Sequence, residues 1–211
     1  MVNEEKSEEF NLSITLDGDE FIIEKKFLSL GNQYYIRDEG GKKVGFCEEK
    51  SLRIKGELRV YDSEKKDREL FRVKQENITN FNGVFKVIDK KDEGTLGYLE
   101  RKSPESMMLS DWSLMDADEK KIGRAVEDSL LKEIIRFKVF GKVPYRYKLI
   151  QNGSKVGFYK QRINPFKDVY RLQIEEKLEP DIDRRILISL GLLLDALEGK
   201  YRKIKRVLSG F

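Results

Sequence analysis

The sequence contains one short segment, residues 186–197, that is apolar on nearly every side. It reads Ile-Leu-Ile-Ser-Leu-Gly-Leu-Leu-Leu-Asp-Ala-Leu, and only Ser189 and Asp195 have polar side chains. A surface helix has one apolar stripe, whereas a helix that is apolar all round needs cover on all sides. Crossing a bilayer takes about 20 residues, and this segment is shorter. It therefore predicts a helix enclosed by other parts of the protein.

Residues that commonly begin and end helices flank this segment. Pro180-Asp181 suits a helix start with Asp181 or Asp183 as the N-cap, and Gly199 suits a helix end. We therefore expect a central helix over residues 181–198. Its core residues are predicted to be Ile186, Leu187, Leu190, Leu193, Leu194 and Leu197.

Most of the preceding chain alternates between apolar and polar residues, as β-strands do. One hairpin pattern recurs, in which a polar turn is followed by a strand that opens on an aliphatic residue and a glycine. The four aliphatic-glycine pairs are Val44-Gly45, Leu96-Gly97, Ile122-Gly123 and Val156-Gly157. A glycine inside a strand marks a bulge, a bend or a close backbone approach. Its repetition predicts a curved sheet, and hence a mainly β protein: an antiparallel barrel closed around the C-terminal helix.

Several other segments complete this prediction. Further strands are expected at residues 57–61, 70–74 and 169–174, and a further hairpin at residues 10–23. Residues 129–137 predict a second helix, because they follow the acidic pair Glu127-Asp128.

No low-complexity linker divides the chain, so one domain is expected. Residues 1–26 form an N-terminal segment, interpreted as a hairpin joined to the barrel. Residues 27–199 form the barrel with its helix, and residues 200–211 form a basic C-terminal tail.

The composition removes the commonest catalytic chemistry. The chain of 211 residues has no histidine and one cysteine, Cys47. The usual general base and the commonest metal ligand are therefore missing, and no internal disulfide or cysteine-cluster zinc site can form. The acid pairs Glu48-Glu49 and Glu175-Glu176 lie in predicted strands, where adjacent side chains point to opposite faces. We expect no catalytic residue, no cofactor and no metal site.

One acidic segment imitates a calcium-binding loop. Asp116, Asp118 and Glu127 have suitable spacing, but Lys120 and Lys121 stand where an oxygen ligand and a glycine belong. Two ammonium groups would repel the ion, so a hairpin turn is predicted here.

The positive charge is concentrated at the C-terminus. Residues 199–211 carry five cations and no acid, against a net charge of +4 for the whole chain. The predicted anion-binding residues are Lys200, Arg202, Lys203, Lys205 and Arg206. A basic amphipathic segment is typical of contact with a membrane surface or another anionic partner. A second basic pair, Arg184-Arg185, either binds phosphate or lines the rim of the barrel and pairs with acids.

Several segments together resemble the tubby C-terminal-like superfamily, in its LURP-one-related and phospholipid-scramblase-like branch. They are residues 27–36, 111–123, 127–131, 157–166 and 183–199, and the resemblance covers residues 27–199. It implies a barrel of about twelve strands around a central C-terminal helix. Tubby-type members bind phosphoinositide head groups through basic residues. Scramblases carry a Pro-rich N-terminal segment and clustered cysteines, which this sequence lacks.

These observations favour a non-enzymatic module that binds an anionic lipid surface or a protein partner. The alternatives are an interaction scaffold with no lipid role, a scramblase-like activity and a nucleic-acid-binding regulator. The near-neutral body lacks the broad basic footprint of nucleic-acid-binding proteins. With no apolar leader or membrane-spanning segment in the sequence, we expect a cytoplasmic protein that associates peripherally with membranes.

Overall fold

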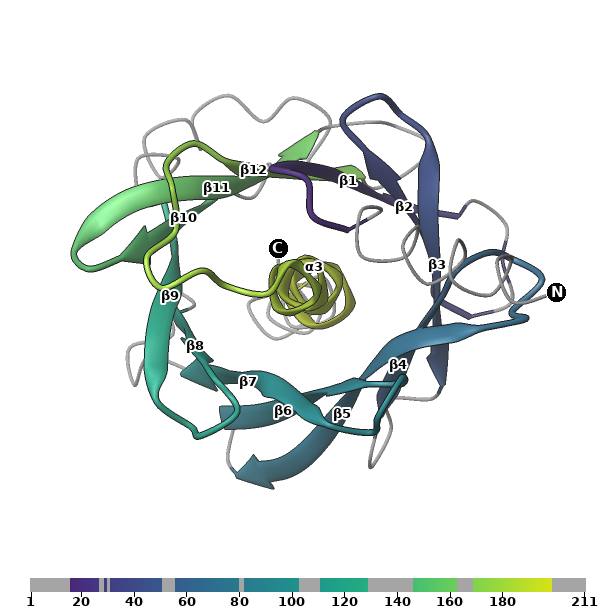
Figure 1. Ribbon diagram of the computed structural model, residues 1–211, viewed down its shortest axis with the longest axis horizontal. Helices are drawn as coiled ribbons and strands as arrows, with labels where there is room; N and C mark the ends of the chain where they lie inside the picture. Colours follow the sequence, from purple (N-terminus) through teal and green to yellow (C-terminus); the bar gives the residue numbers. More distant parts are fainter. Residues whose placement is uncertain are drawn as a thin grey trace, which may run out of the picture.

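The computed structural model describes residues 16–26, 29, 31–50, 56–79, 82–102, 111–128, 146–162 and 169–198. In this part of the chain, twelve antiparallel strands form a closed barrel, and a helix runs through its centre (Figure 1). The strands follow chain order around the barrel, and β1 pairs with β12 to close it. The predicted fold is confirmed.

The strands are β1 (Glu20–Lys25), β2 (Gln33–Asp38), β3 (Lys43–Lys50), β4 (Glu57–Tyr61), β5 (Glu69–Thr79), β6 (Asn82–Asp89), β7 (Thr95–Lys102), β8 (Asp111–Met115), β9 (Lys121–Glu127), β10 (Arg146–Gln151), β11 (Ser154–Arg162) and β12 (Val169–Ile174). The helix α3 (Arg184–Leu193) continues as one π-helical segment, η1 (Leu194–Glu198). The barrel therefore begins within the predicted N-terminal segment, at Glu20. The helix predicted over residues 129–137 and residues 10–15 of the predicted hairpin lie outside the described residues.

The recurrent aliphatic-glycine pair is a β-bulge. In the four predicted hairpins the aliphatic residue is an extra residue in the ladder, and the glycine after it resumes the pairing. A fifth hairpin, β4–β5, has the same bulge at Leu70, with Phe71 in place of glycine. A bulge bends its strand and increases the local twist. Because the strands alternate in direction, the five bulges lie near one end of the barrel, where the chain passes from β12 to α3.

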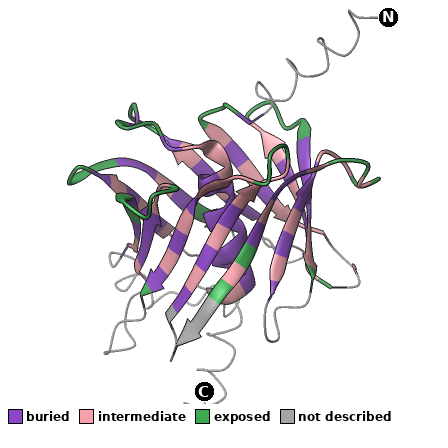
Figure 2. Cartoon of the chain, turned by 60° about the horizontal axis from the view of Figure 1, so that its bottom comes forward, coloured by how far each residue is buried: buried purple, intermediate pink, exposed green. Residues whose placement is uncertain are grey.

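The bulges also help to fill the barrel. The five extra residues are Val44, Leu70, Leu96, Ile122 and Val156, and all of them belong to the core cluster or pack against it. Elsewhere, buried and partly exposed residues alternate along the strands, and the exposed turns gather at this end of the barrel (Figure 2). The end at which α3 begins is thus closed by apolar side chains.

The helix fits tightly against the barrel wall. Five of its six predicted core residues are buried, and the sixth, Leu197, is partly buried. A Cβ atom at Gly97 on β7 would lie 2.8 Å from Ile186 Cδ1 and would clash with the Met115 carbonyl oxygen. A Cβ atom at Gly191 on the helix would clash with Ile23 Cδ1. Glycine at these two positions allows the helix and the wall to approach each other.

Polar contacts fix the helix at three levels. At its start, the Asp183 side chain accepts a hydrogen bond from the Arg185 N–H, so Asp183 is the N-cap. In its middle, the buried Tyr159 hydroxyl donates to the Leu187 carbonyl oxygen at 3.0 Å. In η1, Asp195 accepts from the Tyr34 hydroxyl at 2.8 Å and from Lys25 Nζ at 2.9 Å.

Asp195 is buried, and its carboxylate lies near the negative end of the helix dipole, where an anion is unfavourable. Lys25 and Tyr34 offset this cost, and they are cross-strand partners on β1 and β2. Burial, followed by the charge of Asp195, raises the pKa of Tyr34 well above its usual value. The tyrosine therefore stays protonated and remains a hydrogen-bond donor.

Replacing Gly97 with alanine should lower the free energy of unfolding by about 1–3 kcal/mol, because the new Cβ atom would clash with the Met115 carbonyl oxygen of β8 and with Ile186 of the helix. Gly40→Ala is the matched control, since its Cβ would meet only the Asp38 carboxylate, at 3.4 Å. Chemical denaturation measures both variants. Equal effects would contradict the close contacts of Gly97 with β8 and the helix.

Replacing Asp195 with alanine should lower the free energy of unfolding by about 2–3 kcal/mol, because the buried Tyr34 hydroxyl loses its acceptor. Tyr34→Phe should cost about 1 kcal/mol, and the two effects should not add, since both remove the same hydrogen bond. A double-mutant cycle in denaturant measures this coupling. Additive losses would show that the contact does not anchor the helix.

Candidate anion-binding faces of the barrel

The interior of the described barrel is occupied by protein. The helix fills its centre, and large side chains such as Phe85, Trp112 and Tyr159 are almost fully buried around it. Among the described residues, no helix is long and apolar enough to span a membrane, and no three potential metal ligands of the His, Cys, Asp or Glu type come together. The candidate sites are therefore sought at the ends of the barrel and on its outer wall.

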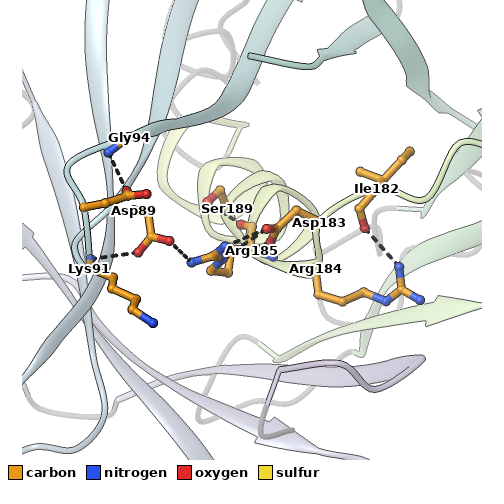
Figure 3. A network of polar contacts seen from close by, with 9 residues as sticks. Asp89, Lys91, Gly94, Ile182, Asp183, Arg184, Arg185 and Ser189 are labelled. Atoms are coloured by element: carbon orange, nitrogen blue, oxygen red, sulfur yellow. Dashed lines mark hydrogen bonds and ion pairs between the residues drawn. The ribbon is translucent and has the colours of Figure 1, made fainter. Parts of the chain in front are cut away.

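Both arginines at the start of α3 form ion pairs with acids, and Figure 3 shows those of Arg185. Arg185 donates to Asp183 and, at 2.7 Å, to Asp89 in β6. Arg184 donates to Asp181 at 2.8 Å and to Asp19, before β1, at 3.1 Å. Of the two predicted roles, the structure shows the second: both arginines pair with acids at the rim.

These ion pairs are reflected in the pKa values of their partners. Burial opposes ionisation of Asp89, but the Lys91 N–H and the Arg185 guanidinium outweigh it and lower the pKa of this carboxyl. Burial likewise opposes the charge of Arg185, but hydrogen bonds to Asp183 and Asp89 raise the pKa of its guanidinium. The pair therefore connects the helix start to the β6–β7 turn and leaves no free cation for phosphate.

The acidic segment at Asp116 is a hairpin turn, as predicted. The Asp116 Oδ1 atom accepts hydrogen bonds from the N–H groups of Asp118 and Lys120, at 3.0 and 2.9 Å. The Asp116 N–H donates to the Lys120 carbonyl oxygen at 3.0 Å, and the Glu119 N–H donates to the Asp116 carbonyl oxygen at 3.1 Å, which closes the turn. The Asp116 carboxylate thus stabilises the turn by accepting hydrogen bonds from nearby backbone N–H groups.

The five predicted anion-binding residues of the tail, Lys200 to Arg206, lie outside the described residues. The described chain ends at Glu198, at the end of the barrel opposite the five bulged turns. The anion-binding role of the five tail residues therefore remains a prediction.

The outer wall carries a row of cations that the sequence analysis missed. Arg146 on β10 is the cross-strand partner of Lys160 on β11, which is the partner of Arg171 on β12. Arg146 lies 3.9 Å from Asp128 and Arg171 lies 3.4 Å from Glu20. Lys160, in the middle, is exposed and has no acidic partner among the described residues. Like charges directly opposite each other destabilise a sheet.

An aromatic ring lies beside this row. Phe158 is on the outer face of β11, with the Arg146 guanidinium and Lys155 Nζ each 5.3 Å from its ring centroid. Its cross-strand partner is Lys148. The six residues Arg146, Lys148, Lys155, Phe158, Lys160 and Arg171 are called the basic face below. Lys148 also pairs with Asp128, at 3.1 Å, and Lys155 pairs with Glu175. The register of the strands brings these residues together. In the sequence, the alternation of cations in residues 145–148 indicated that one face of this strand is basic.

The family model for LURP-one-related proteins matches residues 19–195. The chain belongs to the LURP-one-related family. This family is part of the tubby-like superfamily, so the resemblance seen in the sequence is confirmed. No curated protein and no solved structure matches the chain. The matched region begins just before β1 and ends at Asp195, and so contains all twelve strands.

A second polar site of this LURP-one-related barrel lies on the outside of β1–β3. The β4–β5 turn, residues 62–68, folds over these strands and is called the strap below. The Glu64 carboxylate accepts from Lys26 Nζ at 2.8 Å and from Lys43 Nζ at 3.2 Å. Lys66 donates to Glu48 on β3 at 2.8 Å. Three ion pairs thus attach the strap to the wall.

The strap lies beside an outward-facing aromatic row. Tyr35, Phe46 and Tyr61 are successive cross-strand partners on β2, β3 and β4. Phe46 is only 2% exposed although it is on the outside of the barrel. Lys43 Nζ lies 3.9 Å from the centroid of the Tyr35 ring, close enough for a cation–π contact. The aromatic row is therefore an apolar surface on the outside of the barrel that neighbouring side chains partly cover.

The strap should stay attached in strong acid. Hydrogen bonds, first from Lys26 and then from Tyr35, lower the pKa of Glu64 from 4.5 to about 2. A lowered pKa stabilises the folded state fully above pH about 4.5, and this contribution disappears as the pH falls through about 2. NMR titration of the Glu64 carboxyl should give a midpoint near 2, and Lys26→Ala should raise it. A midpoint near 4.5 in the unaltered protein would contradict the contact.

Proposed function

We propose that this LURP-one-related barrel is a non-enzymatic module that binds an anionic membrane surface through its basic face. The observation that carries the proposal is the row Arg146, Lys160 and Arg171. Arg146 and Arg171 have acids at 3.9 and 3.4 Å, whereas Lys160 between them has none among the described residues. Repulsion of Lys160 by its two cross-strand partners is therefore not compensated by an acid of its own. An anionic surface removes this repulsion and gains about 1 kcal/mol for each cation that it approaches. LURP-one-related and tubby-like proteins are generally non-enzymatic, which agrees with this role.

Phe158 adds an apolar contact to the same face. Its partly exposed ring lies among Arg146, Lys148 and Lys155. At a membrane surface, aromatic rings settle at the level of the head groups, while neighbouring cations contact phosphates. The arrangement of one ring among several cations suits that boundary.

The predicted basic tail supplies a second element. Lys200, Arg202, Lys203, Lys205 and Arg206 would contribute about 1 kcal/mol each near an anionic leaflet. Two linked contacts bind more strongly than either alone, provided that both reach the same surface. The face and the tail are therefore tested separately.

Co-sedimentation with phosphatidylserine-containing vesicles at low salt tests the proposal. The unaltered protein should bind, and binding should fall as salt rises. Lys160→Glu should weaken binding about tenfold or more, because it replaces an attraction with a repulsion. Lys74→Glu, at an exposed position on β5 on the opposite side of the barrel, is the matched control. Removal of residues 200–211 measures the contribution of the tail.

The same Lys160→Glu variant should be more stable by about 0.5 kcal/mol, because its new carboxylate lies between Arg146 and Arg171. Weaker binding then cannot be ascribed to unfolding. If the unaltered protein ignores the vesicles at low salt, the proposal is wrong. Binding to duplex DNA with a steep salt dependence would instead favour the nucleic-acid alternative.

A further inference from the structure

We propose that Lys26, Lys43 and Tyr35 form a carboxylate-binding site, that Glu64 of the strap occupies it, and that an acidic peptide segment of a protein partner takes its place. This surface is separate from the basic face, so the inference does not depend on membrane binding. Glu64 is then a ligand supplied by the chain itself.

The geometry of the contact is that of a bound carboxylate. Each oxygen of Glu64 has its own ammonium donor, Lys26 for Oε2 and Lys43 for Oε1. Lys43 is in turn held over the ring of Tyr35 at 3.9 Å from its centroid. Lys26 lies 5.8 Å from the same ring and 5.7 Å from the Phe46 ring. The two lysines are therefore positioned by the aromatic row.

The strap is attached in a way that allows exchange. The side chains of Lys26, Glu64 and Lys43 are 34%, 40% and 48% exposed, and ion pairs this open to water contribute little to stability. The strap lies on the outside of the wall, so its opening leaves the helix-filled core unchanged.

The surface beneath the strap specifies the chemistry of a partner. Lys26, Arg37 and Lys43 surround Tyr35, and Arg37 lies 5.8 Å from its ring centroid. Once Glu64 is displaced, these three cations outnumber Glu24, which lies 3.6 Å from Arg37, and Glu48, which keeps Lys50 as a partner at 2.9 Å. The aromatic row accepts apolar side chains. The fitting partner is an extended segment in which glutamate or aspartate alternates with an aromatic or aliphatic residue.

The test is a titration of 15N-labelled full-length protein with a hexapeptide of alternating glutamate and phenylalanine, followed by NMR. Glu64→Gln should bind the peptide three- to tenfold more tightly than the unaltered protein, the range that one or two exposed ion pairs supply. The shifts should centre on Tyr35, Lys43 and Phe46. Lys43→Ala, added to Glu64→Gln, should reverse this gain in affinity. A peptide with glutamine in place of glutamate should bind Glu64→Gln no more tightly than the unaltered protein.

Glu69→Gln is the matched control, since Glu69 belongs to the same hairpin but pairs with Arg72 at 2.7 Å. It should leave peptide affinity unchanged. Equal affinity of the unaltered protein and Glu64→Gln, or shifts that map elsewhere, would overturn the inference. If Glu64→Gln failed to fold, Lys43→Ala in the unaltered chain must weaken peptide binding, and an unchanged affinity would overturn it equally.

Discussion

Mutual burial of the helix and the barrel is the interaction on which the rest of the structure depends. A barrel of about eight strands is filled by its own side chains, whereas one of twelve strands is wider and needs a further element inside. The helix supplies that element, and each leucine that it buries contributes about 1.5–3 kcal/mol. The requirement is reciprocal, because the helix has no polar face with which to meet water. The close approaches at Gly97 and Gly191 and the anchor at Asp195 all follow from it.

The enclosed helix also determines where function can be located. The arginines at its start pair with acids of the rim, and its apolar residues pack against the wall. The polar groups that other molecules can contact are therefore on the outer wall, where the strand register places charged side chains beside one another. Two features of the described outer wall bear on function: the row of cross-strand cations centred on Lys160, and the strap that Glu64 attaches to the wall. The first carries repulsion between cations, and the second covers aromatic surface with exposed ion pairs.

Local pattern was sufficient to predict the features that arise from neighbouring residues. The apolar helix, the Asp116 turn and four of the bulges each leave a signal within a few residues, and Asp183 is one of the two N-caps that the sequence offered. The fifth bulge escaped prediction because Phe71 stands where the other hairpins have glycine. The basic face depends on the register of three successive strands, and the place of β1 depends on its pairing with the distant β12; no short pattern records either. The tail residues were predicted from composition alone, and that prediction stands untested.

The pairing of β1 with β12 has a consequence for how the chain reaches its fold. These strands are separated by nearly the whole barrel sequence, and the helix follows both of them. Contacts between residues so far apart in sequence slow folding. During synthesis, β1 and the inward faces of the later strands emerge before the residues that cover them. The nascent barrel therefore exposes unpaired strand edges and apolar surface until α3 has been made, a period in which aggregation competes with folding.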